Sequence, residues 1–304
     1  MSGAQSFSRL VRRGSRPLVT VAVDGTGLPD RPDRAASVLH VTATEAPSNV
    51  RIEDGVLRVA VATAANGTSL DIDGITEATA ALRAAGSDVG AVLLVGDGAN
   101  FCAGGNVRAF ASAERRGDFV GEIATAFHEF VRALDDTTVP VVAAVHGWAA
   151  GAGMSIVCLA DIAIGGTSTK LRPAYPSIGF TPDGGMSWTL PRIVGASRAR
   201  EILLTDAVLN GEESVRLGLL SRIVEDDQVQ DEALRVARTL AAGPTASYAG
   251  IKKLFASSRA NSLSEQLDAE TASISAAADG PTGREGVDAF VEKRRPDFSS
   301  VRNA

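Results

Sequence analysis

The stretch VPVVAAVHGWAAGAGMSIVCLADIAIGG, residues 139–166, decides the fold together with AYPSIGFTPDGGMSWTLP, residues 174–191. Its first seven residues, 139–145, are apolar and rich in valine, which predicts a buried strand. A turn of small residues follows at 149–153, and an apolar helix is predicted over 154–159. The stretch therefore predicts a strand, a glycine-rich turn and a helix in immediate succession.

The small-residue turn has two interpretations. Small residues let a ligand approach the backbone closely, and the first N–H groups of a helix have no partner within the helix. Such a turn suits an anion, or an oxygen atom that becomes anionic during a reaction. The alternative is a tight strand-to-helix connection without a ligand, because glycine-rich turns are common. This stretch alone leaves both interpretations open.

Composition excludes several classes of protein. The chain has 304 residues, of which 45% are hydrophobic and 22% charged, so it can form one or two globular domains with an ample core. Its net charge of -6 argues against nucleic acid as the main partner. No apolar run approaches the roughly 18–20 residues of a membrane span. The cysteines and histidines show neither a disulfide framework nor metal-ligand spacing, so we expect a cytoplasmic protein without a metal.

Residues 1–48 are predicted to form an N-terminal extension. Residues 1–16 are basic and contain no acidic side chain, and the apolar run 18–23 is too short for a secretory signal. We interpret this segment as a disordered or partner-contacting arm, with a transit peptide as the alternative. Residues 18–23 and 38–42 are possible strands, and no function follows from the extension.

The main domain is predicted over residues 49–195, where strands and helices alternate as in an α/β domain. A second small-residue turn, FCAGGN at 101–106, directly follows a predicted strand. The predicted elements are a hairpin over 50–62, helices over 73–85 and 118–135, and strands over 91–95, 139–145 and 162–164. Residues 196–304 are predicted to be all helical and to serve as a cap or an assembly element. The helices expected there are 197–204, 212–217, 229–241, 246–257, 263–277 and 284–294.

Two small-residue turns, each closing a strand and separated by one helix and one strand, resemble the crotonase (enoyl-CoA hydratase/isomerase) superfamily. Five motifs in the same order carry the resemblance, and any one of them alone would be weak evidence. They are FCAGGNVRAF (101–110), PVVAAVHGWAAGAGMSIVCLADIAI (140–164), IGFTPDGGMSWTLPRIVG (178–195), LNGEESVRLGLLSRIV (209–224) and EGVDAFVEKRRPDF (285–298). The resemblance covers about residues 49–298.

The resemblance implies an α/β fold, the ClpP-like crotonase spiral of ββα units, with a helical C-terminal region that forms homotrimers or hexamers. Members of the superfamily bind acyl-CoA thioesters, and coenzyme A comes with the substrate, so no separate cofactor is expected. Two backbone N–H groups hold the thioester oxygen as it becomes an enolate. By motif position these groups belong to Ala103 and Ala152. Two such preorganised donors contribute on the order of several kcal/mol to stabilising a transition state.

The chain departs from the superfamily pattern at the two glutamates that hydratases place around a water molecule. The matching positions hold Ser155 and Tyr175, so a two-glutamate hydration is not expected. Asp183 matches a position that isomerase-type members use for proton transfer. Its carboxylate is a candidate base that removes an α or γ proton and returns it to the other carbon. The alternative is that Asp183 caps a helix beginning at Gly184, because Asp is a preferred N-cap residue.

The other candidate pocket residues have simpler interpretations. Ser155 is expected to pack beneath the turn instead of acting as a nucleophile, because no histidine lies at recognisable triad spacing. Tyr175 is expected to line the acyl pocket, or alternatively to donate a hydrogen bond to the substrate. Trp148 is expected to be a pocket wall or a packing residue. Nothing marks Cys102 as an activated thiol.

For coenzyme A, the resemblance implies Arg108 near the phosphates. It also implies that Phe290 and Lys293 reach the nucleotide of a neighbouring subunit. A solvated helix face remains the alternative for Lys293.

The favoured function is an enoyl-CoA isomerase with Asp183 as the proton shuttle. Hydration by a substituted mechanism is one alternative, and a catalytically weak acyl-CoA-binding or assembly subunit is another. A ClpP-like peptidase is disfavoured because a Ser-His-Asp signature is missing. The expected partners are an acyl-CoA thioester and further copies of the chain, with neither nucleic acid nor a membrane span.

Overall fold

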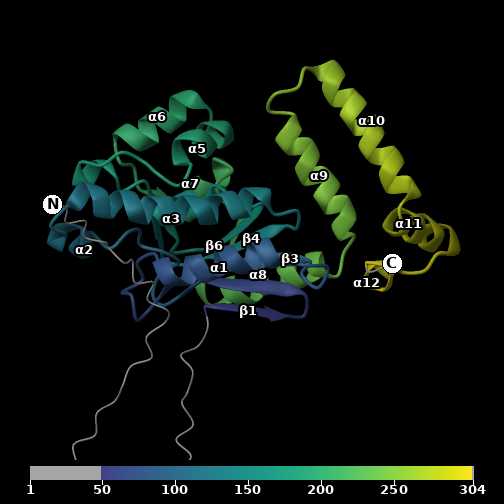
Figure 1. Cartoon of the computed structure of the whole chain (residues 1–304), viewed down its shortest axis with the longest axis horizontal. Coiled ribbons are helices and arrows are strands. Elements are labelled where there is room, and N and C mark those ends of the chain that lie inside the picture. Colours follow the sequence, from purple (N-terminus) through teal and green to yellow (C-terminus); the bar gives the residue numbers. More distant parts are fainter. Residues whose placement is uncertain (1–48, 303–304) are drawn as a thin grey trace, which may run out of the picture. The chain divides into compact units, whose positions relative to one another are not determined.

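The computed structural model describes residues 49–302 (Figure 1). The basic arm at 1–16 and the possible strands at 18–23 and 38–42 lie outside the described residues.

The main sheet of the described part has the strand order β1-β2-β3-β4-β6-β9. Its strands are β1 (Val50–Glu53), β2 (Val56–Thr63), β3 (Ala91–Asp97), β4 (Val141–Val145), β6 (Ile162–Gly166) and β9 (Arg222–Val224). The predicted hairpin is confirmed, because β1 and β2 pair antiparallel around Asp54 and Gly55. The other neighbours pair parallel. Parallel strands covered on both faces read as continuous apolar runs, as β3 does.

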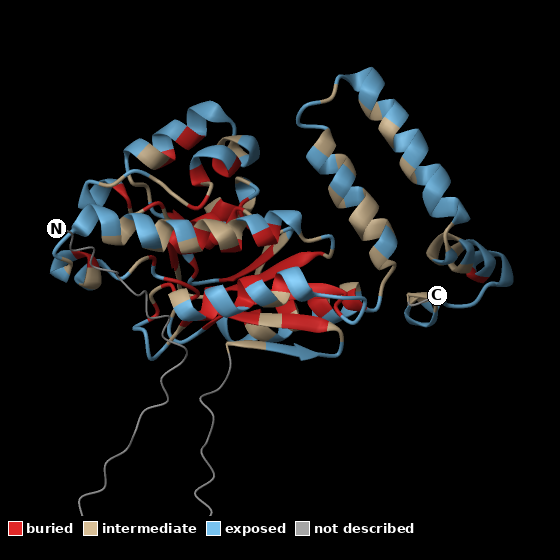
Figure 2. Ribbon diagram, viewed as in Figure 1, coloured by how far each residue is buried: buried red, intermediate tan, exposed pale blue. Residues whose placement is uncertain are grey.

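Helices cover both faces of this sheet (Figure 1). Helices α1 (Ile72–Ala84) and α3 (Arg116–Asp136) lie on one face, and α8 (Val229–Ala241) lies on the other. Alternate residues of β3 separate accordingly, since Leu94 packs in a buried cluster with α1 and α3, and Leu93 packs with α8. Figure 2 shows the buried residues concentrated in the strands between these helical layers. The predicted α/β fold is confirmed.

A second sheet in the described residues consists of β5 (Trp148–Ala150), β7 (Lys170–Arg172) and β8 (Leu209–Asn210). Ala149 and Ala150 belong to β5, so the prediction that they lie in a turn is wrong. A strand of three residues is too short for alternation of apolar and polar side chains to be visible. Its pairing comes from β7, a partner far along the chain.

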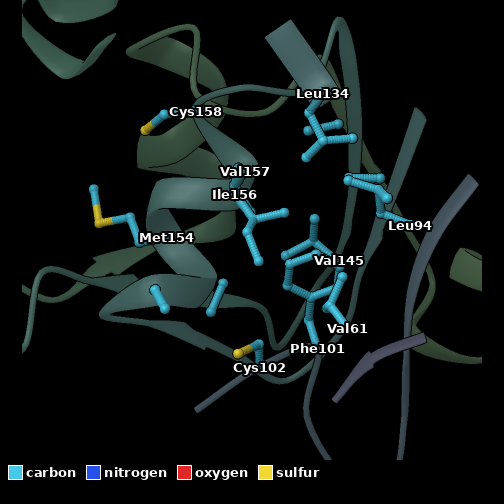
Figure 3. Packing of buried hydrophobic residues seen from close by; sticks show 14 of the residues in the cluster. Val61, Leu94, Phe101, Cys102, Leu134, Val145, Met154, Ile156, Val157 and Cys158 are labelled. Atoms are coloured by element: carbon cyan, nitrogen blue, oxygen red, sulfur yellow. The ribbon is translucent and has the colours of Figure 1, made fainter. Parts of the chain in front are cut away.

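The remaining helices of the core are short. They are α2 (Val107–Ser112), α4 (Ala152–Val157), α5 (Met186–Val194), α6 (Ala196–Leu204) and α7 (Gly211–Arg216), with 3₁₀ turns at Pro176–Ile178 and Asp226–Gln228. Figure 3 shows Ile156 of α4 in the buried cluster that also holds Val145 and Leu94. The apolar side of α4 thus anchors the glycine-rich turn before it to the sheet.

The C-terminal helices are α9 (Thr245–Ser257), α10 (Leu263–Asp279), α11 (Pro281–Glu292) and α12 (Phe298–Val301). The expectation of an all-helical region after residue 195 is wrong at β8 and β9, whose two or three residues carry no periodicity. Strand β9 pairs with β6 and extends the main sheet. The domain boundary at 195 stays a prediction. None of the helices in residues 49–302 combines the length and apolarity that a membrane span requires.

Candidate active site

The two small-residue turns predicted from the sequence lie against each other. The Cys102 N–H donates to the Trp148 carbonyl at 3.1 Å, and the Ala150 N–H donates to the Cys102 carbonyl at 2.9 Å. Gly104 and Gly151 follow, with φ of 94° and 53°. A Cβ on Gly151 would lie 3.5 Å from the Gly104 Cα. Glycine at both positions permits the left-handed backbone and the close approach of the two turns.

Backbone N–H groups at these turns differ in whether they are already bonded. The Ala103 N–H donates to the Thr68 carbonyl at 2.8 Å. The prediction of Ala103 as a free donor is therefore contradicted, because the chain still pairs with a neighbouring segment there. Ala152 is the first residue of α4, where an N–H has no acceptor within the helix. Among the described residues, no acceptor is found for the Gly105 N–H either. Gly105 and Ala152 thus offer the unpaired donors.

A cavity of about 690 Å³ opens beside the two turns and includes Gly105 and Ala152 in its wall. Most of its wall is apolar. The larger apolar side chains are Leu70, Val107, Phe110, Val120, Ile123, Phe127, Ile178, Phe180 and Pro182. Within the described part of the chain, Asp183 is the one carboxylate among the lining residues, and Arg116 is the one cation. The cavity therefore joins an apolar compartment, a carboxylate and two backbone donors.

Asp183 is held by three different elements. Its Oδ1 accepts a hydrogen bond from the Tyr175 hydroxyl at 2.7 Å. Its backbone carbonyl accepts from Ser155 Oγ of α4 at 3.0 Å. The next N–H, that of Gly184, donates to Nε2 of His128 in α3 at 3.1 Å. The carboxylate is thereby fixed at the cavity wall.

The alternative role of Asp183 as a helix cap is wrong. Helix α5 begins at Met186, its N-cap residue is Gly185, and no side chain bonds to its first turn. Two glycines in the left-handed region separate Asp183 from the helix, with φ of 60° at Gly184 and 77° at Gly185. The carboxylate bonds to Tyr175 instead.

Ser155 and Tyr175 form a polar pair beneath the carboxylate. Ser155 is fully buried and its Oγ lies 3.2 Å from the Tyr175 hydroxyl. This agrees with the expected packing beneath the turn, and no histidine bonds to Ser155 in the described chain. Burial, and then the negative charge of Asp183, raises the pKa of Tyr175 above its ordinary value. Tyr175 therefore stays protonated and acts as a hydrogen-bond donor.

His128 is a site residue that the sequence did not predict. Its Nε2 accepts the Gly184 N–H, so in the neutral ring the proton is on Nδ1. His128 follows Phe127 in an amphipathic helix, and helical spacing carries no signal that the ring meets a loop 56 residues later.

The described chain matches the family model for enoyl-CoA hydratase/isomerase over residues 51–301. The protein belongs to the enoyl-CoA hydratase/isomerase family. The predicted membership of the crotonase superfamily is thus confirmed, and with it an enzyme family that acts on acyl-CoA thioesters.

Named relatives of the family include both hydratases and an isomerase. The chain is 35% identical over 223 residues to the "Probable enoyl-CoA hydratase" of Rhodobacter capsulatus, covering 73% of this chain and 86% of that protein. It is 35% identical over 215 residues to the 1,2-epoxyphenylacetyl-CoA isomerase of Escherichia coli, and the match covers 68% of this chain and 80% of that protein. The crystal structure of an enoyl-CoA hydratase from Polaromonas sp. JS666 superposes with a TM-score of 0.75 at 29% identity, covering 81% and 97%.

The other residues predicted from the family pattern lie away from the cavity wall. Trp148 is half-buried, and Lys170 Nζ lies 5.3 Å from the centroid of its ring. Arg108 is exposed on α2, and Lys293 is exposed at the end of α11. Phe290 on α11 is 85% exposed. None of these four belongs to the described wall, so their roles stay predictions.

Neither cysteine of this protein is an activated thiol. Cys102 and Cys158 are both buried, and burial raises the pKa of each thiol to about 12. Within residues 49–302, no group of three His, Cys, Asp or Glu side chains is arranged to hold a metal ion.

Proposed function

We propose that the protein is an enoyl-CoA isomerase that moves a double bond of its acyl chain into conjugation with the thioester. The observation that carries this proposal is the position of Asp183, the one carboxylate in the described cavity wall. The two positions that hold glutamates in family hydratases contain Ser155 and Tyr175, so the site offers one base instead of two.

The reaction requires one base that gives back the proton it takes. Asp183 removes a proton from C2 of a 3-enoyl-CoA, and the electron pair of that C–H bond moves onto the thioester oxygen through the carbonyl. The protonated carboxyl then delivers the proton to C4. A double bond forms between C2 and C3 as the one between C3 and C4 is lost. No atom is gained or lost by the substrate.

The dienolate between the two steps needs donors for its oxygen. The N–H groups of Gly105 and Ala152 are unpaired in the described fold, and both residues line the cavity. Gly105 takes the place that the sequence analysis gave to Ala103. The apolar wall excludes water and so strengthens these hydrogen bonds as negative charge develops.

The test is to incubate the protein with a 3-enoyl-CoA and follow the conjugated 2-enoyl thioester by its ultraviolet absorbance. We expect conjugation by the parent and a loss of roughly a hundredfold or more in Asp183→Asn, because the amide cannot take a proton. The control is Asp73→Asn, which should keep full activity because Asp73 is exposed on α1. If the parent binds coenzyme A ligands but forms no conjugated product, the isomerase proposal fails for that substrate.

Hydration is the second candidate, and the name of the Rhodobacter capsulatus relative favours it. In that reaction Asp183 would activate a water molecule for addition to C3 of a 2-enoyl-CoA. The same absorbance would then fall as a 3-hydroxyacyl-CoA forms. Binding of acyl-CoA without either change, and without sensitivity to Asp183→Asn, would instead identify a binding subunit.

We also propose assembly into a homotrimer or hexamer through the C-terminal helices. In the described structure α9 and α10 contain no buried residue. Large apolar side chains are exposed on α9, α10 and α11, namely Ile251, Phe255, Leu263, Leu267, Ile274, Val287, Phe290 and Val291. Exposed apolar surface of this extent is typical of an interface. Assembly would also allow Phe290 and Lys293 of one subunit to approach coenzyme A on another, with Arg108 contributing from the subunit that binds the acyl group.

A further inference from the structure

We propose that Tyr175 is a positioning residue that orients Asp183 for proton transfer, with Ser155 directing the tyrosine hydroxyl. The inference rests on the proposed isomerase function. It gives a role to the two positions at which this chain lacks glutamate, because the residues found there hold the single carboxylate in place.

The contacts of the three side chains carry the inference. The Tyr175 hydroxyl donates to Asp183 Oδ1 at 2.7 Å. No protein donor reaches Oδ2 in the described part of the chain, so this oxygen is left for the substrate. The tyrosine ring is 8% exposed, and its hydroxyl lies 3.2 Å from Ser155 Oγ. A buried ring with a bonded hydroxyl cannot rotate away without leaving a polar atom unpaired.

Hydrogen bonds also restrain the backbone on both sides of the Asp183 side chain. Ser155 Oγ is also 3.0 Å from the Asp183 carbonyl, so one hydroxyl contacts both the backbone and the tyrosine. The Gly184 N–H is fixed by His128. With the backbone held on both sides, the remaining freedom of Asp183 is rotation of its carboxylate, and the Tyr175 hydroxyl removes that freedom.

Tyr175 is suited to donate a hydrogen bond and unsuited to act as the base. Its pKa is raised by burial and by the neighbouring carboxylate, so the phenol keeps its proton throughout the working range of pH. A donor on Oδ1 holds one carboxylate oxygen in place and leaves the other free to face the substrate. The hydroxyl therefore contributes by orienting the carboxylate.

The kinetic test compares Tyr175→Phe with the parent, since this change removes one oxygen atom and keeps the ring. We expect kcat to fall roughly 10- to 100-fold, the range for loss of a hydrogen bond to a charged group, with KM little changed. Ser155→Ala should show a smaller loss, because Ser155 does not touch the carboxylate.

The chain supplies a matched control, because Tyr248 is its only other tyrosine. Tyr248→Phe on α9 should leave both kcat and KM unchanged. Equal thermal unfolding temperatures of the variants would show that the fold is retained.

A spectroscopic test is independent of turnover. Protein labelled with ¹³C at Cζ of tyrosine should give two resonances, which the two Phe variants assign. We expect Asp183→Asn to shift the Tyr175 resonance and to leave that of Tyr248 in place. An unmoved Tyr175 resonance would overturn the contact whatever the enzyme does.

Activity separates the two proposals. An active parent with an inactive Asp183→Asn and a fully active Tyr175→Phe would overturn the positioning role and leave the isomerase standing. A parent without isomerase activity would overturn the proposed function, and the positioning role for that reaction with it.

Discussion

At the scale of single residues, Gly184 shows how tightly the carboxylate loop is packed. Its φ of 60° lies in the left-handed region. A Cβ there would lie 2.3 Å from Cε1 of Phe127 and 2.9 Å from Cβ of Ser155. Phe127 is 1% exposed and packs in the core, so its ring would have to leave its packed position to admit this Cβ. The loop that carries Asp183 thus excludes any side chain at the next position.

Gly184→Ala should lower the free energy of unfolding by about 2–4 kcal/mol, the sum of a steric overlap in the core and a strained backbone. Urea unfolding monitored by circular dichroism measures the change. Gly121→Ala is the control, because nothing lies within 4 Å of a Cβ at this exposed position of α3. There we expect a gain of about 0.5–1 kcal/mol. Equal stability of Gly184→Ala and the parent would contradict the packing described.

At the scale of elements, the end of α11 is held by charge. Arg294 forms two hydrogen bonds with Glu285, at 2.6 and 2.9 Å, and Glu285 also accepts the Asp297 N–H at 2.6 Å. The hydrogen bonds from the Arg294 side chain are the main reason that the pKa of Glu285 is lowered from 4.5 to about 2. Helix α11 ends at Glu292 and is followed by the C-cap residue Lys293 in the left-handed region, and this contact network fixes the chain that leads to α12.

The pKa of Glu285 is lower in the folded protein than in the unfolded chain, so its carboxylate stabilises the fold more at high pH than at low pH. This stabilisation is fully present above about pH 4.5 and is lost as the pH falls toward about 2. Glu285→Gln should therefore speed hydrogen exchange of the segment 293–298 at neutral pH. The difference in exchange rate between the variant and the parent should vanish near pH 2, where Glu285 is protonated in the parent. Asp288→Asn, an exposed change on the same helix, should match the parent at every pH.

At the scale of the whole molecule, the described chain has one well-filled core and a helical region without one. Buried side chains fill both faces of the main sheet, whereas α9 and α10 contribute none. Long helices with exposed apolar side chains gain stability only when a further surface covers them. This is the structural reason for the proposed assembly.

Light scattering should give a molar mass that is three or six times the chain mass of 31.3 kDa. Phe255→Glu should reduce the assembled fraction, because Phe255 is 70% exposed on α9 and a buried charge there would be unpaired. Ile52→Glu is the control, since Ile52 is 52% exposed on β1 and outside the C-terminal helices. A monomeric parent would contradict the assembly proposal.

The sequence predicted the elements that carry long apolar patterns and missed those that depend on distant partners. The hairpin and the amphipathic α3 follow from periodicity over several residues, and β3 and β4 follow from continuous apolar runs. Strands β5 and β9 have three residues each, and their pairing with β7 and β6 cannot be read locally.

For the candidate site, the sequence predicted the two turns and Asp183 but not the atoms that serve it. The bond from Ala103 to Thr68 and the one from Gly184 to His128 each join segments far apart in the chain. The link between Tyr175 and Asp183 spans 8 residues, yet it depends on the fold of the intervening loop. Motif position identifies a residue, and only the fold shows whether its polar atoms are already bonded.

The unpaired donors at the cavity belong to the main chain of Gly105 and Ala152, not to side chains. A codon change can replace a carboxylate or a hydroxyl in one step, but it cannot delete a peptide N–H unless it introduces proline. The proposed contacts to an oxygen anion are therefore robust to mutation, whereas the side chain proposed to move the proton is free to vary. With this separation, one fold can keep the donors proposed to stabilise an enolate, while changes in side chains alter the reaction that the enolate undergoes.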